Sequence, residues 1–102
     1  MSLRVRPSEP PASLGLTILA QISGIHAADQ GGRVVIDSVL RDSRGEKVGL
    51  ASGDLIVAVN GTEIHSTREL NEQLAAASER SSVILSIARG RYIYNLTFPM
   101  AI

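Results

Sequence analysis

The chain has 102 residues, which is enough for one domain and too short for two independent cores. Apolar residue types make up 44% of it and charged types 20%, so it can bury a core and is not a disordered tail. Ten basic residues cancel ten acidic ones and are spread along the chain, which argues against a binder of nucleic acid or of acidic membranes. The absence of cysteine excludes disulfides, thiolate nucleophiles and cysteine-based metal sites.

The N-terminal segment is polar and rich in proline. Residues 6–13 contain three of the four prolines, which favours an extended segment with no packing role. We therefore predict a linker over residues 1–12 and a single domain over residues 13–100. A linker in this position indicates a module of a larger protein, and an ordinary N-terminus is the alternative. The first residues carry charge but no apolar segment follows them, so they are not a secretory signal.

The first half of the domain is expected to form two strands and one helical turn. Residues 14–20 are mostly apolar and suit a strand. Glycines at positions 24, 31 and 32 mark a loop, and residues 33–40 follow as a second, largely apolar strand. Residues 42–50 have the pattern of a polar turn leading into one short helical turn that ends at Gly49.

The second half is expected to contain two hairpins. Residues 55–59 form a continuous apolar run, which predicts a buried strand and is far shorter than the roughly 18–20 residues of a membrane span. The run ends at Asn60-Gly61, a strong hairpin signal. Residues 83–88 and 92–98 are two further strands, joined by a tight turn at 89–91.

One longer helix is expected between these hairpins. Ser66 and Glu69 are three residues apart, the spacing of a capping box, in which each side chain satisfies a backbone N–H group. The helix over residues 67–78 then carries one apolar stripe at helical spacing, formed by Leu70, Leu74 and Ala77.

The sequence shows no catalytic or metal-binding constellation. His26 and His65 lie far apart and neither has a second ligand at metal spacing, so we expect both to be solvated. No serine lies in a Gly-x-Ser-x-Gly turn, and no glycine cluster forms a phosphate loop. Asp54 is expected to bond backbone N–H groups of its own turn. We therefore predict no enzymatic activity, no catalytic residue, no cofactor and no metal.

The segment Leu14-Gly15-Leu16 is a candidate binding site. Glycine lets neighbouring backbone N–H groups point toward one centre, which forms a cradle for a carboxylate. If residues 16–19 formed a sheet edge facing the helix at 67–77, the gap between them would accept an extended peptide as an added strand. The alternative is an ordinary strand start packed in the core, and on the local sequence the two are evenly matched.

Taken together, these segments resemble a bacterial PDZ domain. The resemblance covers about residues 13–98 and is carried by residues 14–17, 34–39 and 48–61 and by the helix that contains Glu69-Leu70. Its most specific part is the run Gly-Asp-Leu-Ile-Val-Ala-Val-Asn-Gly at 53–61. Within that family the chain is most similar to the PDZ modules that follow the protease domain in periplasmic HtrA/Deg-type serine proteases. Residues 21–32 would then be a long insert between the first two strands.

This resemblance implies an α+β fold and a set of peptide-binding residues. The fold would be a partly open β-barrel or sandwich of five to six strands with one long and one short helix. Its topology would be the circularly permuted bacterial one, in which the last strand takes the place of the animal domain's first. The implied carboxylate loop is Leu14, Gly15 and Leu16, the implied ligand-pairing strand contains Thr17 and Ile18, and the implied helix positions are Thr67, Leu70, Asn71 and Leu74.

The implied function is that of a non-catalytic peptide-binding module. It would capture C-terminal or extended segments of misfolded protein substrates by strand addition, and recruit them to, or regulate, an attached serine protease. The resemblance also implies a bacterial periplasmic location, a role in protein quality control, and a full-length protein that can be a homo-oligomer. The even spread of charge and the short apolar runs predict no nucleic-acid partner and no membrane span. The alternative is a structural module with a vestigial groove, which packs against the protease domain or a neighbouring subunit through Tyr92, Tyr94 and Phe98.

Overall fold

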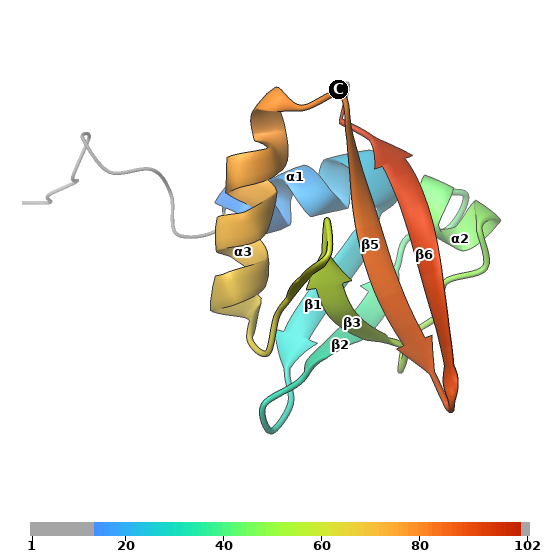
Figure 1. Ribbon diagram of the computed structural model, residues 1–102. Coiled ribbons are helices and arrows are strands. Elements are labelled where there is room, and N and C mark those ends of the chain that lie inside the picture. The colour runs from blue at the N-terminus through green and yellow to red at the C-terminus, as the bar shows by residue number, and fades with distance from the viewer. Residues whose placement is uncertain (1–13, 101–102) are drawn as a thin grey trace, which may run out of the picture.

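The computed structural model describes residues 14–100, so the predicted linker over residues 1–12 lies outside the described residues. In chain order the elements are α1 (Leu14–Ser23), β1 (Ile25–Asp29), β2 (Val34–Val39), α2 (Arg44–Lys47), β3 (Leu55–Val59), β4 (Thr62–Glu63), α3 (Thr67–Ala76), a short 3-10 helix (Ala77–Glu79), β5 (Ser82–Arg89) and β6 (Tyr92–Pro99) (Figure 1).

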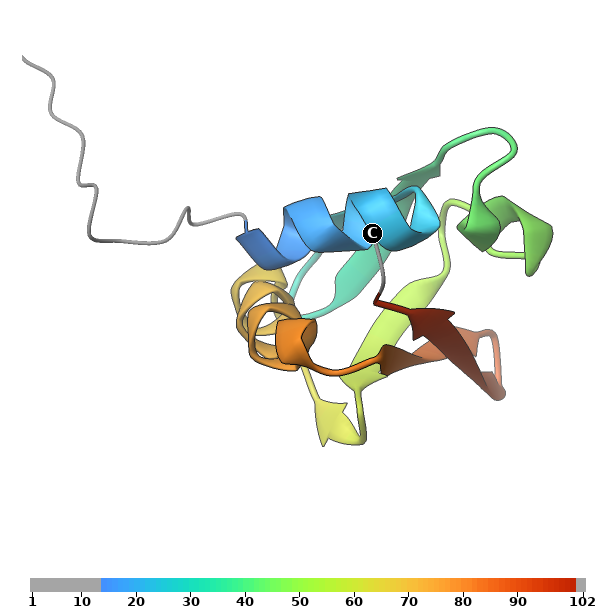
Figure 2. The same cartoon turned by 90° about the horizontal axis from the view of Figure 1, so that it is seen from above.

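The six strands form one antiparallel sheet. Its order is β1-β2-β3-β5-β6, with β4 paired to β3 beside this path. Figures 1 and 2 show α3 along one side of the sheet and α1 crossing α3 above it. The α+β architecture predicted from the sequence is therefore confirmed. No helix among the described residues is long and apolar enough to cross a bilayer.

The first element is a helix, and the prediction of a strand over residues 14–20 is wrong. Gly15, Ile18, Leu19 and Ile22 are all buried on one side of α1. Their spacing of three, one and three residues is that of a helix face, whereas a strand would bury every second residue. The β-branched composition of this short segment is a weak signal, and packing against the rest of the chain overrides it.

The strand that follows lies inside the segment that the resemblance assigns to an insert. The Gly24 N–H donates to the Ala20 carbonyl oxygen at 2.8 Å and ends α1, and Gly24 has a φ of 76°, which favours glycine. The chain then enters β1, which pairs with β2 and is joined to it by a turn closed by Gln30 and Arg33. Residues 21–32 therefore contain the end of α1 and the whole of β1.

The remaining elements lie where the sequence predicts them. Ser43 caps α2 by accepting from the Glu46 N–H, and the hairpin at Asn60 places β4 against β3. Ser66 caps α3 by accepting from the Glu69 N–H at 3.1 Å. In a standard capping box the Glu69 carboxylate would accept from the Ser66 N–H, but here it accepts from the His65 N–H. β5 and β6 pair over their full length as a hairpin.

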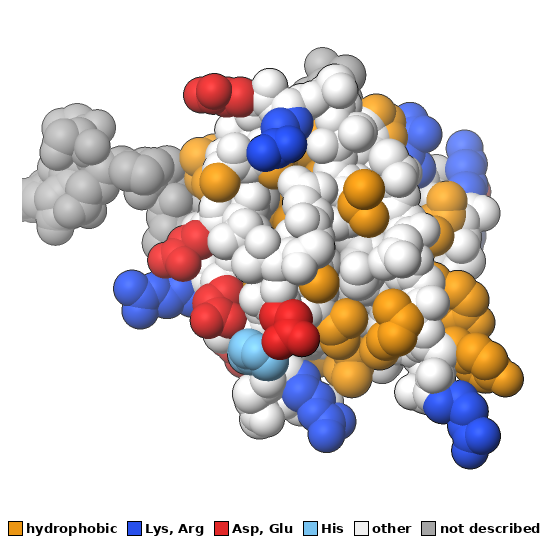
Figure 3. Space-filling view, in the orientation of Figure 1, with side chains coloured by type: hydrophobic (Ala, Val, Ile, Leu, Met, Phe, Trp, Pro, Cys, Tyr) orange, Lys and Arg blue, Asp and Glu red, His pale blue; other side chains and the backbone are white. Residues whose placement is uncertain are grey.

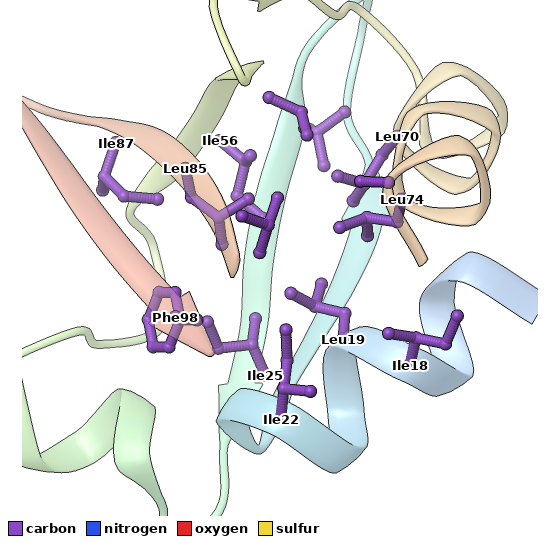
Figure 4. Close-up of a cluster of buried hydrophobic side chains, with 14 of the residues drawn as sticks. Ile18, Leu19, Ile22, Ile25, Ile56, Leu70, Leu74, Leu85, Ile87 and Phe98 are labelled. Atoms are coloured by element: carbon purple, nitrogen blue, oxygen red, sulfur yellow. The ribbon is translucent and has the colours of Figure 1, made fainter. Parts of the chain in front are cut away.

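The core lies between the sheet and the two longer helices. Leu19 of α1, Leu70 and Leu74 of α3, and Leu85 and Phe98 of the last hairpin are fully buried in it (Figure 4). Phe98 therefore belongs to the core and is not available as the interaction surface proposed from the sequence. Since α1 supplies several core side chains, it is an integral part of the domain.

Candidate functional site

The edge of β1 beside α3 is the candidate peptide-binding site. β1 is the first strand of the sheet and has a neighbour on only one side. α3 packs close to it, so a helix and an open strand edge lie together (Figure 1). An exposed edge of this kind can accept an extended segment through backbone hydrogen bonds.

One end of this edge is joined to α3 by a side-chain contact. Asp29 is the last residue of β1, and its carboxylate accepts from the Thr67 N–H at 2.7 Å and from the Thr67 hydroxyl at 2.8 Å. The Thr67 N–H is one of the donors that the first turn of a helix leaves without an internal partner. These bonds from the Thr67 backbone and hydroxyl hold the pKa of Asp29 below its ordinary value of 3.8.

A second contact lies one turn further along α3. The Asn71 side-chain oxygen accepts from the Gly15 N–H at 2.6 Å and from the Leu16 N–H at 3.1 Å. These amides belong to the first turn of α1, so Asn71 caps α1 from another helix. The amides that the sequence assigns to a carboxylate loop therefore bind an amide oxygen of the same chain.

Helices α1 and α3 approach each other very closely at this point. A Cβ atom at Gly15 would overlap the backbone carbonyl oxygen of Asn71. Glycine is required at position 15 because any side chain would push the two helices apart. The role of Gly15 is thus helix packing, and the Leu14-Gly15-Leu16 segment forms no loop.

The other predicted site residues divide into two groups. Thr17 is exposed and Ile18 is buried, and both lie inside α1, where the backbone is bonded within the helix and cannot pair with a peptide strand. Leu70 and Leu74 are fully buried, and Figure 4 shows them in the hydrophobic cluster with Leu19. Of the nine predicted residues, only Thr67 and Asn71 lie half-buried on α3 with polar groups beside β1 or α1.

Two hollows among the described residues lie away from this edge. A cavity of about 490 Å³ lies between the end of α1 and α2, with Gly24, Arg41 and Lys47 in its lining. A second, of about 150 Å³, is lined by residues of β2 and β3 together with Ile64 and His65. Neither is lined by residues of both β1 and α3.

The family follows from the sequence match. Residues 20–98 match the family model described as a PDZ domain. The chain belongs to the PDZ domain family. PDZ domains are peptide-binding modules without catalytic activity of their own, and their peptides add a strand to an exposed sheet edge. No curated protein matches the chain.

Two solved structures are similar to this PDZ domain. The photosystem II D1 C-terminal processing protease is 25% identical with a TM-score of 0.61, and the match covers 76% of this chain but only 22% of the protease. The PDZ domain of EpsC from Vibrio cholerae, residues 219–305, is 16% identical with a TM-score of 0.60, and the match covers 74% of this chain and 92% of that domain. The likeness to EpsC shows the fold alone.

Asp29 is a site residue that no local sequence signal marks. It lies in the segment assigned to an insert, and its partner Thr67 is 38 residues away in the chain. Thr67 directly follows the capping residue Ser66, so its backbone N–H has no acceptor within α3. Which residue accepts from this N–H depends on the tertiary fold.

The Asp29–Thr67 contact predicts a local pH response. Because the folded-state pKa of Asp29 is depressed, the contact is present above pH 3.8 and is lost as the pH falls through the lower folded value. In an NMR titration the Thr67 amide should shift with a midpoint below pH 3.8, and Asp29→Ala should abolish that shift. Asp37→Ala, which removes another exposed carboxylate in a strand, should leave it unchanged. A midpoint at or above 3.8 would contradict the assignment.

Proposed function

We propose that this PDZ domain binds extended or C-terminal segments of protein substrates along the edge of β1, beside α3. In the longer protein it would serve as the regulatory module of an attached serine protease of the HtrA/Deg type, in the bacterial periplasm. The observation that carries the binding site is the edge strand β1 lying beside α3. Similarity to part of a processing protease supports the attachment to a peptidase.

The two contacts on α3 determine how a peptide would enter. Thr67 and Asn71 are four residues apart, which places them about 6 Å apart along the helix axis. The Asp29 carboxylate already bonds Thr67, and the backbone N–H groups of the first turn of α1 already bond the Asn71 side chain. A peptide that lies between β1 and α3 must therefore displace the Asp29 carboxylate from Thr67, because α1 is held in the core and yields less readily.

This mechanism predicts that loss of Asp29 strengthens peptide binding. Asp29→Ala frees the Thr67 N–H and hydroxyl for the ligand and removes a carboxylate that would repel a C-terminal carboxylate. We expect at least a threefold lower Kd for the variant. Glu72→Ala, which removes an exposed carboxylate that pairs with Arg68 elsewhere on α3, is the matched control and should bind as the wild type does.

The test is an NMR titration of the labelled domain with short peptides ending in apolar residues. Each peptide is offered with a free and with an amidated C-terminus. Shifts at Ile25–Asp29 and at Thr67 support the proposed site, and their loss on amidation identifies recognition of the carboxylate. Shifts that survive amidation indicate binding of extended segments without end recognition, which the proposal also includes. If neither wild type nor Asp29→Ala responds at β1 with any peptide, the proposed site is wrong.

The assembly alternative is favoured by a separate observation. Tyr92 and Tyr94 are 63% and 46% exposed on the last hairpin, far along the sheet from β1. Exposed apolar side chains that cluster on one element mark interaction surfaces. A domain can carry both sites, because the two lie at opposite edges of the sheet.

A further inference from the structure

The two edges of the sheet differ in how well they are protected from pairing with another chain. β1 is five residues long, has an irregular register between His26 and Ala27, and ends in the charged Asp29. α3 also lies beside it. Short length, irregular register, charge and a covering helix disfavour edge-to-edge pairing with the sheet of another folded domain.

The opposite edge, β6, lacks these features. It is eight residues long, and no residue from Tyr92 to Pro99 is charged. Among the described residues, the backbone of these eight positions makes hydrogen bonds only within the ladder with β5. A long, uncharged strand with one side unpaired is a template for another strand.

The surface around β6 is also unusually apolar. Tyr92, Ile93 and Tyr94 are 63%, 58% and 46% exposed, and the neighbouring Ile84 of β5 is 42% exposed. The two tyrosine rings lie with their centroids 6.5 Å apart. Figure 3 shows hydrophobic side chains gathered over the end of the β5–β6 hairpin. The edge therefore offers both free backbone groups and side chains that gain from leaving water.

We propose that β6 is a self-association site at which two copies of this domain pair their β6 strands antiparallel about a two-fold axis. This inference deepens the assembly alternative given above and is independent of peptide binding at β1. If the axis passes through Asn95, Tyr94 lies opposite Leu96 of the second copy, and Tyr92 lies opposite Phe98 of the second copy. The apolar face that begins with the buried Phe98 and the half-buried Leu96 then continues across the junction.

The charge distribution favours a second copy as the occupant. A two-fold antiparallel pair brings each strand against its own sequence, so any charge near the axis would meet its like, and β6 has none. The nearest cation, Arg91, lies in the hairpin turn at one end of β6. In the pair, the two copies of Arg91 would be about 26 Å apart, which is beyond the screening length of roughly 8–10 Å. Two β6 strands can therefore pair without repulsion between like charges.

The test is analytical ultracentrifugation of the 102-residue chain over a range of concentrations up to about 1 mM. The wild type should change from monomer to dimer mass with rising concentration. Asn95→Lys places two ammonium groups opposite each other at the axis and should weaken dimerisation at least tenfold. Ser38→Lys adds the same charge at an exposed position of β2 and should dimerise as the wild type does. Circular dichroism checks that each variant is folded.

A second variant is needed because Asn95 also bonds Ser86 within the hairpin, so Asn95→Lys can destabilise the fold. Thr97→Lys is exposed, has no such bond among the described residues, and should weaken the dimer as well. A wild type that stays monomeric throughout, or an assembly that both lysine variants leave intact, would overturn the proposal. An amidated peptide bound at β1 should not change the dimer mass, which separates this result from failure of the peptide site.

Discussion

Replacing Gly15 with alanine or leucine should separate α1 from α3 and lower the stability of the whole domain. The new Cβ overlaps the backbone carbonyl oxygen of Asn71, and a backbone atom cannot turn aside as a side-chain tip can. Overpacking in a closely packed interior costs about 1–3 kcal/mol. The loss should be larger for leucine, and for alanine it is partly offset by a gain of about 1 kcal/mol in helix propensity.

Urea unfolding followed by circular dichroism measures this effect. Thr17→Ala is the matched control, because Thr17 is exposed on the same helix, and its substitution should change the free energy of unfolding by less than about 0.5 kcal/mol. If Gly15 belonged to a ligand loop, its replacement would remove peptide binding and leave the urea midpoint unchanged. That result would contradict the packing of α1 described here.

Removing the carboxylate of Asp54 should produce the second large loss of stability. The Asp54 side chain is only 7% exposed, and Arg89 donates to both of its oxygens, at 2.8 Å from Nε and 2.5 Å from a terminal nitrogen. The Ala51 N–H donates to the same carboxylate at 3.0 Å. The pair links the turn before β3 to the end of β5. Since Asp54→Ala removes three hydrogen bonds to one charged, nearly buried acceptor, we expect a loss of about 1–3 kcal/mol.

The sign of the pH dependence distinguishes this ion pair from a simple packing role. The hydrogen bonds from Arg89 hold the pKa of Asp54 below its ordinary value of 3.8, despite the opposing effect of burial. Its contribution is therefore present above pH 3.8 and is lost as the pH falls through the lower folded value. The stability difference between wild type and Asp54→Asn should be full at pH 6 and should shrink below pH 3.8.

A conservative variant of the partner tests the geometry. Arg89→Lys keeps the positive charge but cannot donate to both carboxylate oxygens at once while also reaching the Gly49 carbonyl. It should therefore be less stable than the wild type by urea unfolding and more stable than Arg89→Ala. Equal stability of the wild type and both variants would show that the pair does not contribute.

The internal contacts beside β1 and the unpaired edge of β6 lead to different expectations for the two proposed sites. At β1, polar contacts of Thr67 and Asn71 already occupy the positions from which a peptide would be held. At β6, eight residues without charge remain unpaired on one side. Peptide capture at β1 is thus expected to compete with an internal contact, whereas self-association at β6 has no such competitor among the described residues.

The local sequence determined most of the elements, because their signals lie within a few residues. Asn60-Gly61 predicts the hairpin after β3, Ser66 and Glu69 predict the start of α3, and the apolar run at 55–59 predicts β3. Each of these depends on a turn, a cap or a period that neighbouring residues satisfy among themselves. The α+β fold and the PDZ family could therefore be predicted without the structure.

Only the tertiary structure decided the conformation and role of residues 14–29. A short apolar segment with one glycine is compatible with a strand or a helix, and the choice depends on which face finds a partner. Here Gly15 meets Asn71, 56 residues further along the chain, and Asp29 meets Thr67 across 38 residues. Contacts over such separations have no local signal, so the predicted carboxylate loop became a helix, and the predicted insert became the strand beside α3.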